Sequence, residues 1–258
     1  MIRGLWDRET VALLMIAAVA PLAAAWLWYG GVPAALRLVM MLLIAGAWHL
    51  IFLLARAQPP SYAGALTALA VAMLAPGGLG PLQIALGLSF GVVMGELVFG
   101  GWGRNIVNPA TVTAMFLGFG FPAAGWPGVT APLAWAAIGG VALGVGFGVM
   151  SARLAAGAIV AAAIAWAAGM APDRAWMAAA VVFVLLVADP VTSAATALGR
   201  WLEGAAYAGL VVLFAANWQG ATPVQLSVAA AFLASLAAPL LDELALWAWL
   251  QRRGRIHG

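Results

Sequence analysis

The chain is poor in the residues on which most soluble enzymes depend. Its 258 residues include no cysteine, no lysine and two histidines, and charged residues make up 7% of the total. A soluble domain carries about 25% charged and about 45–50% apolar residues, whereas 66% of this chain is apolar and its mean hydropathy is +1.07. A soluble globular fold is therefore excluded, and so is a disordered chain, which needs the opposite balance. The sequence predicts an all-α polytopic membrane protein.

The missing side chains also exclude several kinds of redox centre. Without cysteine the chain cannot hold an iron–sulfur cluster through thiolates, attach a c-type haem or form a disulfide of its own. His257 lies in the polar C-terminal tail, which argues against a haem held by His49 and His257. No spacing typical of metal ligands is present, and the scattered arginines form no extended patch, so we expect neither a metal nor a nucleic acid as partner.

Proline, glycine and arginine residues divide the chain into ten apolar segments. A membrane-spanning helix needs about 20 residues, so ten crossings use most of the chain and make residues 1–258 one integral membrane domain. The predicted segments are 10–29, 33–54, 61–75, 82–99, 106–121, 133–150, 154–171, 175–188, 201–218 and 224–241.

The arginines test this count independently. If all ten segments cross the bilayer, one side receives only Arg37 and Arg174. The side with both termini receives nine: Arg3, Arg8, Arg56, Arg104, Arg153, Arg200, Arg252, Arg253 and Arg255. Because positively charged loops stay inside, the sequence predicts a multi-pass protein of a bacterial inner membrane with both termini in the cytoplasm and the bilayer as its surroundings.

Ten crossings divide into five plus five, and a repeated unit with an odd number of crossings is inverted. The predicted halves are 1–121 and 133–241, joined by an external loop at 122–132 and followed by a cytoplasmic tail at 242–258. The third and eighth segments are mates under this pairing, and both are short and follow prolines. Such paired short segments are typical of a binding site near the bilayer midplane.

A first polar cluster precedes the fifth segment. Asn105 and Asn108, followed by Pro109 and Thr111, lie at a spacing that puts both amides on one face of a helix. Amides both donate and accept hydrogen bonds, which suits the edge of a polar heterocycle. The alternative is that the asparagines cap the fifth helix, with Pro109 in its first turn.

Carboxylates in or beside the apolar segments form a second group of candidates. Asp189, followed by Pro190 and Thr192, ends the eighth segment, where an ionisable side chain usually faces a cavity or a partner; the alternative is an N-cap for the next helix. Glu96 lies inside the fourth segment, where it could line an ion path or pair with Arg104. Asp242, beside the C-terminal arginines, is expected to be an ordinary interfacial charge.

Three stretches together resemble a known family. They are 87–101, which reads GLSFG through VFGG, then 105–110, NIVNPA, and 188–193, ADPVTS, followed by Gly199 and Arg200. In this order and spacing they are similar to the RnfD/NqrB family of ten-helix subunits, found in the Rnf ferredoxin:NAD oxidoreductase and in the sodium-pumping NADH:quinone reductase. The similarity covers about 60–245.

The resemblance implies a flavin-carrying subunit that passes electrons across the membrane and is coupled to Na⁺ or H⁺ movement. It also implies a pseudo-symmetric five-plus-five bundle like that of urea transporters, with iron–sulfur and FMN-binding subunits as partners. The family's riboflavin or FMN pocket and its ion-linked polar residues would fall on Asn105, Asn108 and Asp189. The chain would then act as part of a translocase and not as an enzyme alone.

Two departures from the family keep alternatives open. Family members carry a Ser-Gly-Ala-Thr segment in the external loop, where FMN is esterified to the threonine; here the nearest match is Thr130 in 128–133, so the flavin is either noncovalent or joined to Thr130. Glu96 stands where family members often carry lysine, which puts the usual ion path in question. A solute transporter or channel of similar fold, or a membrane anchor for redox partners, remains the alternative function.

Overall fold

The computed structural model describes residues 7–170 and 175–254, and every element assigned within them is helical. Predicted features at Arg3, Arg174, Arg255 and His257 lie outside the described residues. Many helices are apolar around their whole circumference, which is typical of a helix in a membrane bundle. Large apolar side chains accordingly cover the outer surface, including Trp28, Leu54 and Trp166. The predicted all-α class is confirmed.

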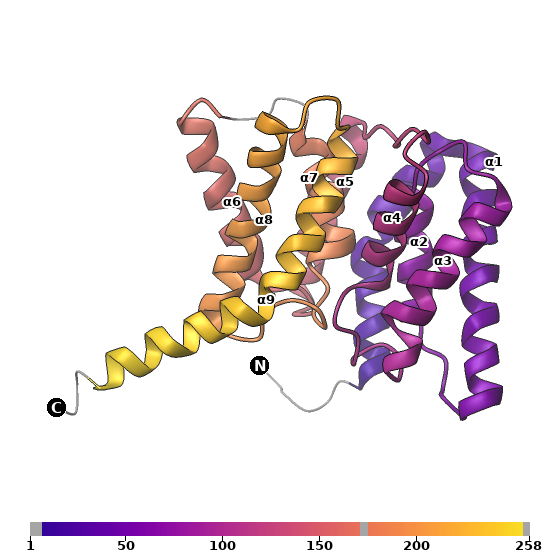
Figure 1. The fold of residues 1–258 in the computed structure, drawn as a ribbon, viewed down its shortest axis with the longest axis horizontal. Helices are drawn as coiled ribbons and strands as arrows, with labels where there is room; N and C mark the ends of the chain where they lie inside the picture. The colour runs from indigo at the N-terminus through magenta and orange to yellow at the C-terminus, as the bar shows by residue number, and fades with distance from the viewer. Residues whose placement is uncertain (1–6, 171–174, 255–258) are drawn as a thin grey trace.

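The first helix is interrupted by a glycine. Helix α1 (Arg8–Arg56) contains non-helical angles at Gly31, with φ 58° and ψ −148°, a combination that essentially only glycine adopts. Pro33 follows, whose fixed φ suits the first turn of a helix and which has no N–H to donate. Figure 1 shows the chain rising through the first half of α1 and returning through the second. The two halves correspond to the first two predicted segments.

The next helices are short. They are α2 (Ala63–Leu74), α3 (Pro81–Gly95) with the 3₁₀ turn η1 (Leu97–Phe99), and α4 (Pro109–Gly120). Three glycines at four-residue spacing let α3 approach α4 closely. A Cβ on Gly91 would lie 2.7 Å from the carbonyl oxygen of Pro109, and a Cβ on Gly95 would lie 3.1 Å from its Cα. Gly87 similarly faces Leu117.

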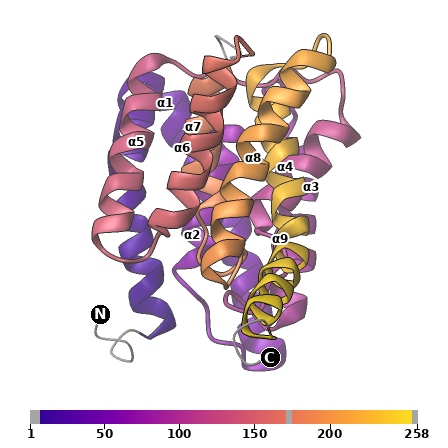
Figure 2. The same ribbon diagram turned by 90° about the vertical axis from the view of Figure 1, so that its left-hand side faces the viewer.

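The second part of the chain contains α5 (Ala131–Gly146), α6 (Ala152–Ala167), α7 (Ala175–Val182), the π-helical turn η2 (Phe183–Val187), α8 (Ala197–Asn217) and α9 (Pro223–Gly254). Successive helices run in alternate directions between two ends of the bundle (Figure 1). We call the end where α1 begins the lower end. The final turns of α9 extend away from the bundle at that end (Figures 1 and 2). Helix therefore continues through the start of the predicted tail at 242–258.

Every predicted segment overlaps a described helix, the first two both lying in α1, although the boundaries differ. Within residues 7–170 and 175–254, four helical stretches are long and apolar enough to cross a membrane: α1, Pro81–Phe99, α8 and Pro223–Gln251. The remaining apolar helices have 10–17 residues. The third and eighth segments are short, as predicted, since α2 has 12 residues, and the π-helical turn η2 follows the eight-residue α7 directly.

Candidate functional site

Two polar loops far apart in the sequence meet at the lower end of the bundle. One joins η1 to α4 and carries Asn105 and Asn108, and the other joins η2 to α8 and carries Asp189 and Thr192. The Nδ2 atom of Asn108 donates a hydrogen bond to Oδ2 of Asp189 over 2.9 Å, and both side chains are buried. The structure therefore brings together the two motifs that the sequence analysis singled out.

The pair is fixed by backbone contacts on both sides. Asn108 is the N-cap of α4, and its Oδ1 accepts from the N–H of Ala110 at 2.9 Å, so the predicted capping alternative is confirmed for Asn108 and not for Asn105. Oδ1 of Asp189 accepts from the N–H of Val191 at 3.0 Å. Burial raises the pKa of the Asp189 carboxyl, while the hydrogen bonds from Val191 and Asn108 act to lower it.

Two sequence interpretations were wrong. Asn105 does not share a helix face with Asn108, because α4 begins only at Pro109 and Asn105 lies in the preceding loop. Its Oδ1 accepts from the N–H of Gly103 at 3.1 Å. Asp189 is not the N-cap of α8, a position that Thr196 occupies. Asn105 lies in a glycine-containing loop before α4. Asp189 lies in the loop between η2 and α8, where Pro190 follows it.

Three buried polar atoms near these motifs have no hydrogen-bond partner: Nδ2 of Asn105, Oγ1 of Thr111 and Oγ1 of Thr192. Thr192 and Trp102 lie beside the Asp189 carboxylate, although the Thr192 hydroxyl does not reach hydrogen-bond geometry. Pro109 contributes its carbonyl, which accepts from the hydroxyl of Thr113 at 2.9 Å. An unpaired buried polar atom costs free energy, so these atoms are available to a ligand.

The cavity at this site decides how well a flavin fits. Its volume is about 20 Å³, and its lining includes Asn108, Asp189, Trp102 and Thr67. A space of this size holds about one water molecule. The unpaired atoms of Asn105, Thr111 and Thr192 belong to residues outside this lining, and the cavity does not admit the three-ring system of a flavin. Space for the ring would have to come from a movement of the helices or from a neighbouring subunit.

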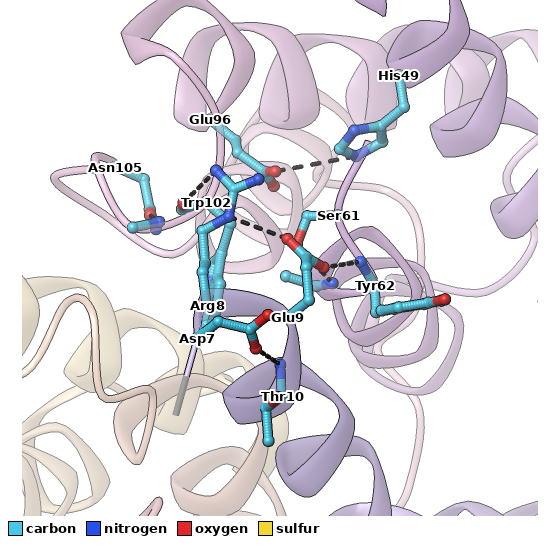
Figure 3. Close-up of polar contacts among 12 residues, drawn as sticks. Asp7, Arg8, Glu9, Thr10, His49, Ser61, Tyr62, Glu96, Trp102 and Asn105 are labelled. Atoms are coloured by element: carbon cyan, nitrogen blue, oxygen red, sulfur yellow. Dashed lines mark hydrogen bonds and ion pairs between the residues drawn. The ribbon is translucent and has the colours of Figure 1, made fainter. Parts of the chain in front are cut away.

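Glu96 faces a different neighbour from the one expected. Within the part of the chain that the structure describes, Glu96 forms no ion pair with Arg104; its Oε1 lies 3.9 Å from Nε2 of His49. The carboxylate is fully buried between α3 and η1. Figure 3 shows Arg8 beside it, with the guanidinium directed to the carbonyl of Trp102 and to Glu9.

Sequence reasoning missed Glu203 and underestimated Asp242. Glu203 of α8 is fully buried, and its Oε2 accepts from the N–H of Ala194 at 2.7 Å. Asp242 of α9 accepts from the N–H groups of Ala195 and Thr196 and from the Thr196 hydroxyl, so it holds the loop before α8 and is more than an interfacial charge. The available signal for Glu203 was its place about one helical turn after Arg200, which follows the ADPVTS stretch.

Thr130 lies far from the polar loops. It is the exposed N-cap residue of α5, its hydroxyl makes no capping hydrogen bond, and the loop that carries it lies at the upper end of the bundle in Figure 1. A free, accessible hydroxyl is what attachment of a phosphate ester requires. The structure does not bring Thr130 together with Asn108 and Asp189.

The apolar helices and buried polar loops define the chain as a multi-pass integral membrane protein with a polar site formed between distant loops. The sequence matches the profile of the NQR2, RnfD, RnfE family over residues 2–137. The chain belongs to this family, as the resemblance predicted.

Curated relatives agree with this assignment. The chain is 30% identical over 270 residues to a Na(+)-translocating NADH-quinone reductase subunit of Pseudomonas aeruginosa strain LESB58, covering 82% of this chain and 66% of that protein. It is 34% identical over 116 residues to the subunit of the same name from Klebsiella pneumoniae strain ATCC 700721 / MGH 78578, covering 41% and 28%. The corresponding Yersinia pestis protein is 38% identical over 84 residues, covering 33% and 20%. This chain thus spans less than two thirds of the length of these relatives.

Proposed function

We propose that this chain is the flavin-binding membrane subunit of an ion-translocating electron-transport complex of the Rnf/Nqr type in the bacterial inner membrane. The observation that carries the proposal is the buried hydrogen bond between Asn108 and Asp189. It joins, in three dimensions, two motifs on which the family resemblance rests. The relatives bear the name of a subunit of a Na⁺-translocating NADH-quinone reductase, which supports a multi-subunit redox complex.

The flavin would supply the redox chemistry, accepting and releasing electrons, while the protein positions it and tunes its potential. Asn105, Thr111 and Thr192 would bind its polar edge through the atoms that now lack partners, once a movement of the helices or a neighbouring subunit provides space for the ring. Asn108 and Pro109 shape the loop that presents them, and Asp189 sets the local charge. In the alternative to this noncovalent flavin, an FMN would be esterified to Thr130 at the other end of the bundle.

We further propose ten crossings arranged as a five-plus-five inverted repeat. The helix contacts support this arrangement. When each of the first five segments is matched with the segment five places later, a contact between two helices of the first half corresponds to a contact between their counterparts in the second half. The contact of α3 with α4 has its mate in α8 with α9, and the contact of α2 with α4 has its mate in α7 with α9. The contacts of α4 with α9 and of α2 with η2 each join two mates directly, as a two-fold axis requires.

This topology can be tested with single cysteines, since the native chain has none. With both termini in the cytoplasm, Pro59→Cys at the lower end would react with a thiol reagent only from the cytoplasmic side. Gly128→Cys in the external loop would react from outside. Labelling of both variants from the same side would overturn the ten-crossing arrangement.

Ion movement would follow the buried carboxylates. Glu96 and Asp189 are the candidates, because both are buried near the lower end and the charge of Asp189 acts on Glu96. A carboxylate close to a flavin also experiences the charge of an added electron. The electrons would be exchanged with partner subunits that carry iron–sulfur centres and FMN. The translocated ion would be Na⁺ or H⁺.

The deciding experiment is extraction of the complex in mild detergent, followed by absorbance and flavin analysis. We expect flavin bound to the wild-type chain, and at least a tenfold loss of noncovalent flavin in Asn105→Ala combined with Thr192→Val. Asn217→Ala is the control, because Asn217 is exposed and bonds only its own helix at Leu213. A flavin-free wild-type chain that conducts a solute into liposomes would instead establish the transporter alternative.

A chain without flavin that is still needed for assembly of the redox partners would establish the anchor alternative. In that case the double variant would leave electron transfer through the complex unchanged. These three outcomes differ in bound chromophore, solute flux and assembly, so each can be distinguished from the other two.

A further inference from the structure

A groove on the outside of the bundle leads to a histidine that the redox proposal does not use. The groove has a volume of about 310 Å³ and lies between the second half of α1 and the start of α2, with Leu42, Gly46, Leu53, Ser61 and Gly64 in its lining. Leu50 and Leu53 on its rim are exposed on the outer surface of the bundle, and Pro60 and Ser61 of the loop between α1 and α2 also line it, so the groove reaches the lower end of the bundle, where water is present. His49 lies in the lining and is itself 7% exposed.

The position of the imidazole depends on a glycine. A Cβ on Gly64 would lie 2.6 Å from Nε2 of His49, so any larger residue at the start of α2 would displace the ring. Nε2 is buried and has no hydrogen-bond partner. An unpaired buried nitrogen is costly in a bundle that is otherwise well packed, which points to a ligand or a proton at this atom.

Glu96 lies on the inner side of His49. Its side chain has 0% exposure, and neither carboxylate oxygen has a hydrogen-bond partner, although the backbone N–H of Trp102 is nearby. The distance from Oε1 to Nε2 of His49 is 3.9 Å (Figure 3). This gap is too long for a direct hydrogen bond, but a small rotation of either side chain or one water molecule would close it.

The other charged groups around the pair are already engaged. Arg8 and Glu9, from the start of α1, bind one another at 2.9 Å, and Arg8 also donates to the carbonyl of Trp102. Glu9 accepts from the Ser61 hydroxyl and the N–H of Tyr62. Asp189, the remaining carboxylate that acts on Glu96, is bound by Asn108. His49 is therefore the group closest to Glu96 that can exchange a proton with it.

We propose that His49 and Glu96 form a proton-exchange site that loads and releases one proton through the groove. A proton from water at the loop end of the groove, beside Pro60 and Ser61, binds Nε2 of His49, passes to a carboxylate oxygen of Glu96, and returns to water by the same route. The ligand is a proton and not Na⁺, because one of the two facing groups is an imidazole nitrogen, whereas hard cations are bound by several oxygens. The role of this site in ion coupling rests on the proposed redox function, but proton binding does not.

Infrared spectroscopy of the full chain in liposomes, without partner subunits or flavin, tests this site directly. A pH titration of the wild type is expected to show a protonated-carboxyl band that Glu96→Gln removes. His49→Gln should leave the band in place and move the midpoint of its titration by about 1 pH unit or more, since a neighbouring ionisable group changes a carboxyl's proton affinity by this much. Gly64→Ala, which displaces His49 without removing it, should move the midpoint in the same way.

Two carboxylates serve as matched controls. Glu203→Gln removes a buried carboxyl elsewhere and Glu243→Gln an exposed one, and neither should change the midpoint of the Glu96 band. The proposal is overturned if Glu96→Gln leaves the spectrum unchanged, if His49→Gln does not move the midpoint, or if replacing choline chloride with NaCl abolishes the band. Because these measurements need no flavin, loss of the redox proposal would leave their interpretation intact.

Discussion

The Nδ2 atom of Asn108 lies 2.9 Å from Oδ2 of Asp189 and donates a hydrogen bond to it, although the two residues are 81 positions apart. One belongs to the N-terminus of α4 and the other to the loop after η2. A buried polar contact of this kind has few alternatives, because an unpaired carboxylate among apolar helices is costly. It therefore fixes the two loops relative to each other.

Loss of this contact should destabilise the protein. Asn108→Ala removes a donor to Asp189 and the cap of α4, so we expect a loss of about 1–3 kcal/mol, measured as a lower temperature of unfolding in detergent. Asn217→Ala, at an exposed position, should change the unfolding temperature little. An Asn108→Ala protein as stable as the wild type would contradict the structural role of the pair.

A charge at the same position should produce a pH-dependent defect. Asn108→Asp places a second carboxylate against Asp189, whose pKa is already raised by burial. The fold then binds more protons than the unfolded chain, so its stability is greatest at low pH and is lost as pH rises through the raised pKa values. Unfolding temperatures from acidic to neutral pH should diverge from those of Asn108→Ala as pH rises, and parallel curves would contradict this prediction.

Close packing of α3 on α4 can be tested at Gly91. A Cβ at this position meets the Thr113 hydroxyl and the carbonyl oxygen of Pro109, so Gly91→Ala should cost about 1–3 kcal/mol despite the higher helix propensity of alanine. Gly139→Ala in α5 is the matched control, since nothing lies within 4 Å of its Cβ position. We expect Gly139→Ala to be neutral or stabilising in thermal unfolding, and equal effects of the two variants would argue against this helix contact.

Asp242 should stabilise the loop that precedes α8. Its carboxylate accepts hydrogen bonds of 2.7 Å from Ala195, 2.8 Å from the Thr196 N–H and 2.5 Å from the Thr196 hydroxyl. Asp242→Ala removes all three, so we expect a loss of about 1–3 kcal/mol and faster proteolysis between η2 and α8. The neighbouring exposed Glu243→Ala should match the wild type in both assays; a similar defect in both variants would indicate a general charge effect.

The attachment of flavin at Thr130 can be decided by denaturing gel electrophoresis. If FMN is esterified to this hydroxyl, the wild-type band fluoresces and Thr130→Val loses the fluorescence completely. Thr130→Ser keeps a hydroxyl and loses only the methyl group. It tests whether a hydroxyl at this position is enough for attachment of FMN or whether the methyl group is also needed. Fluorescence that survives in Thr130→Val would place the bond elsewhere, and flavin found only in the supernatant would support noncovalent binding.

The class of the protein and the order of its helices follow from the amino-acid sequence alone. Low charge, high apolar content and regular breaks at proline and glycine leave only membrane helices as a stable arrangement, since backbone groups in lipid must be bonded within the helix. The sequence also predicted the family correctly, because the family's motifs are short stretches of residues in a fixed order. The N-cap role of Asn108 followed from the same local chemistry, as an asparagine before a proline.

Packing in three dimensions determines which buried polar side chains lie next to one another. Nothing in the spacing of Glu96 indicated His49 as its neighbour, because that contact depends on how α3, whose C-cap is Glu96, packs against α1 and on the absence of a side chain at Gly64. The helical phase assigned to Asn105 failed for a similar reason, since the loop before α4 takes its shape from hydrogen bonds at its own glycines. Local sequence sets helices and caps, but buried polar pairs depend on packing between segments distant in the chain.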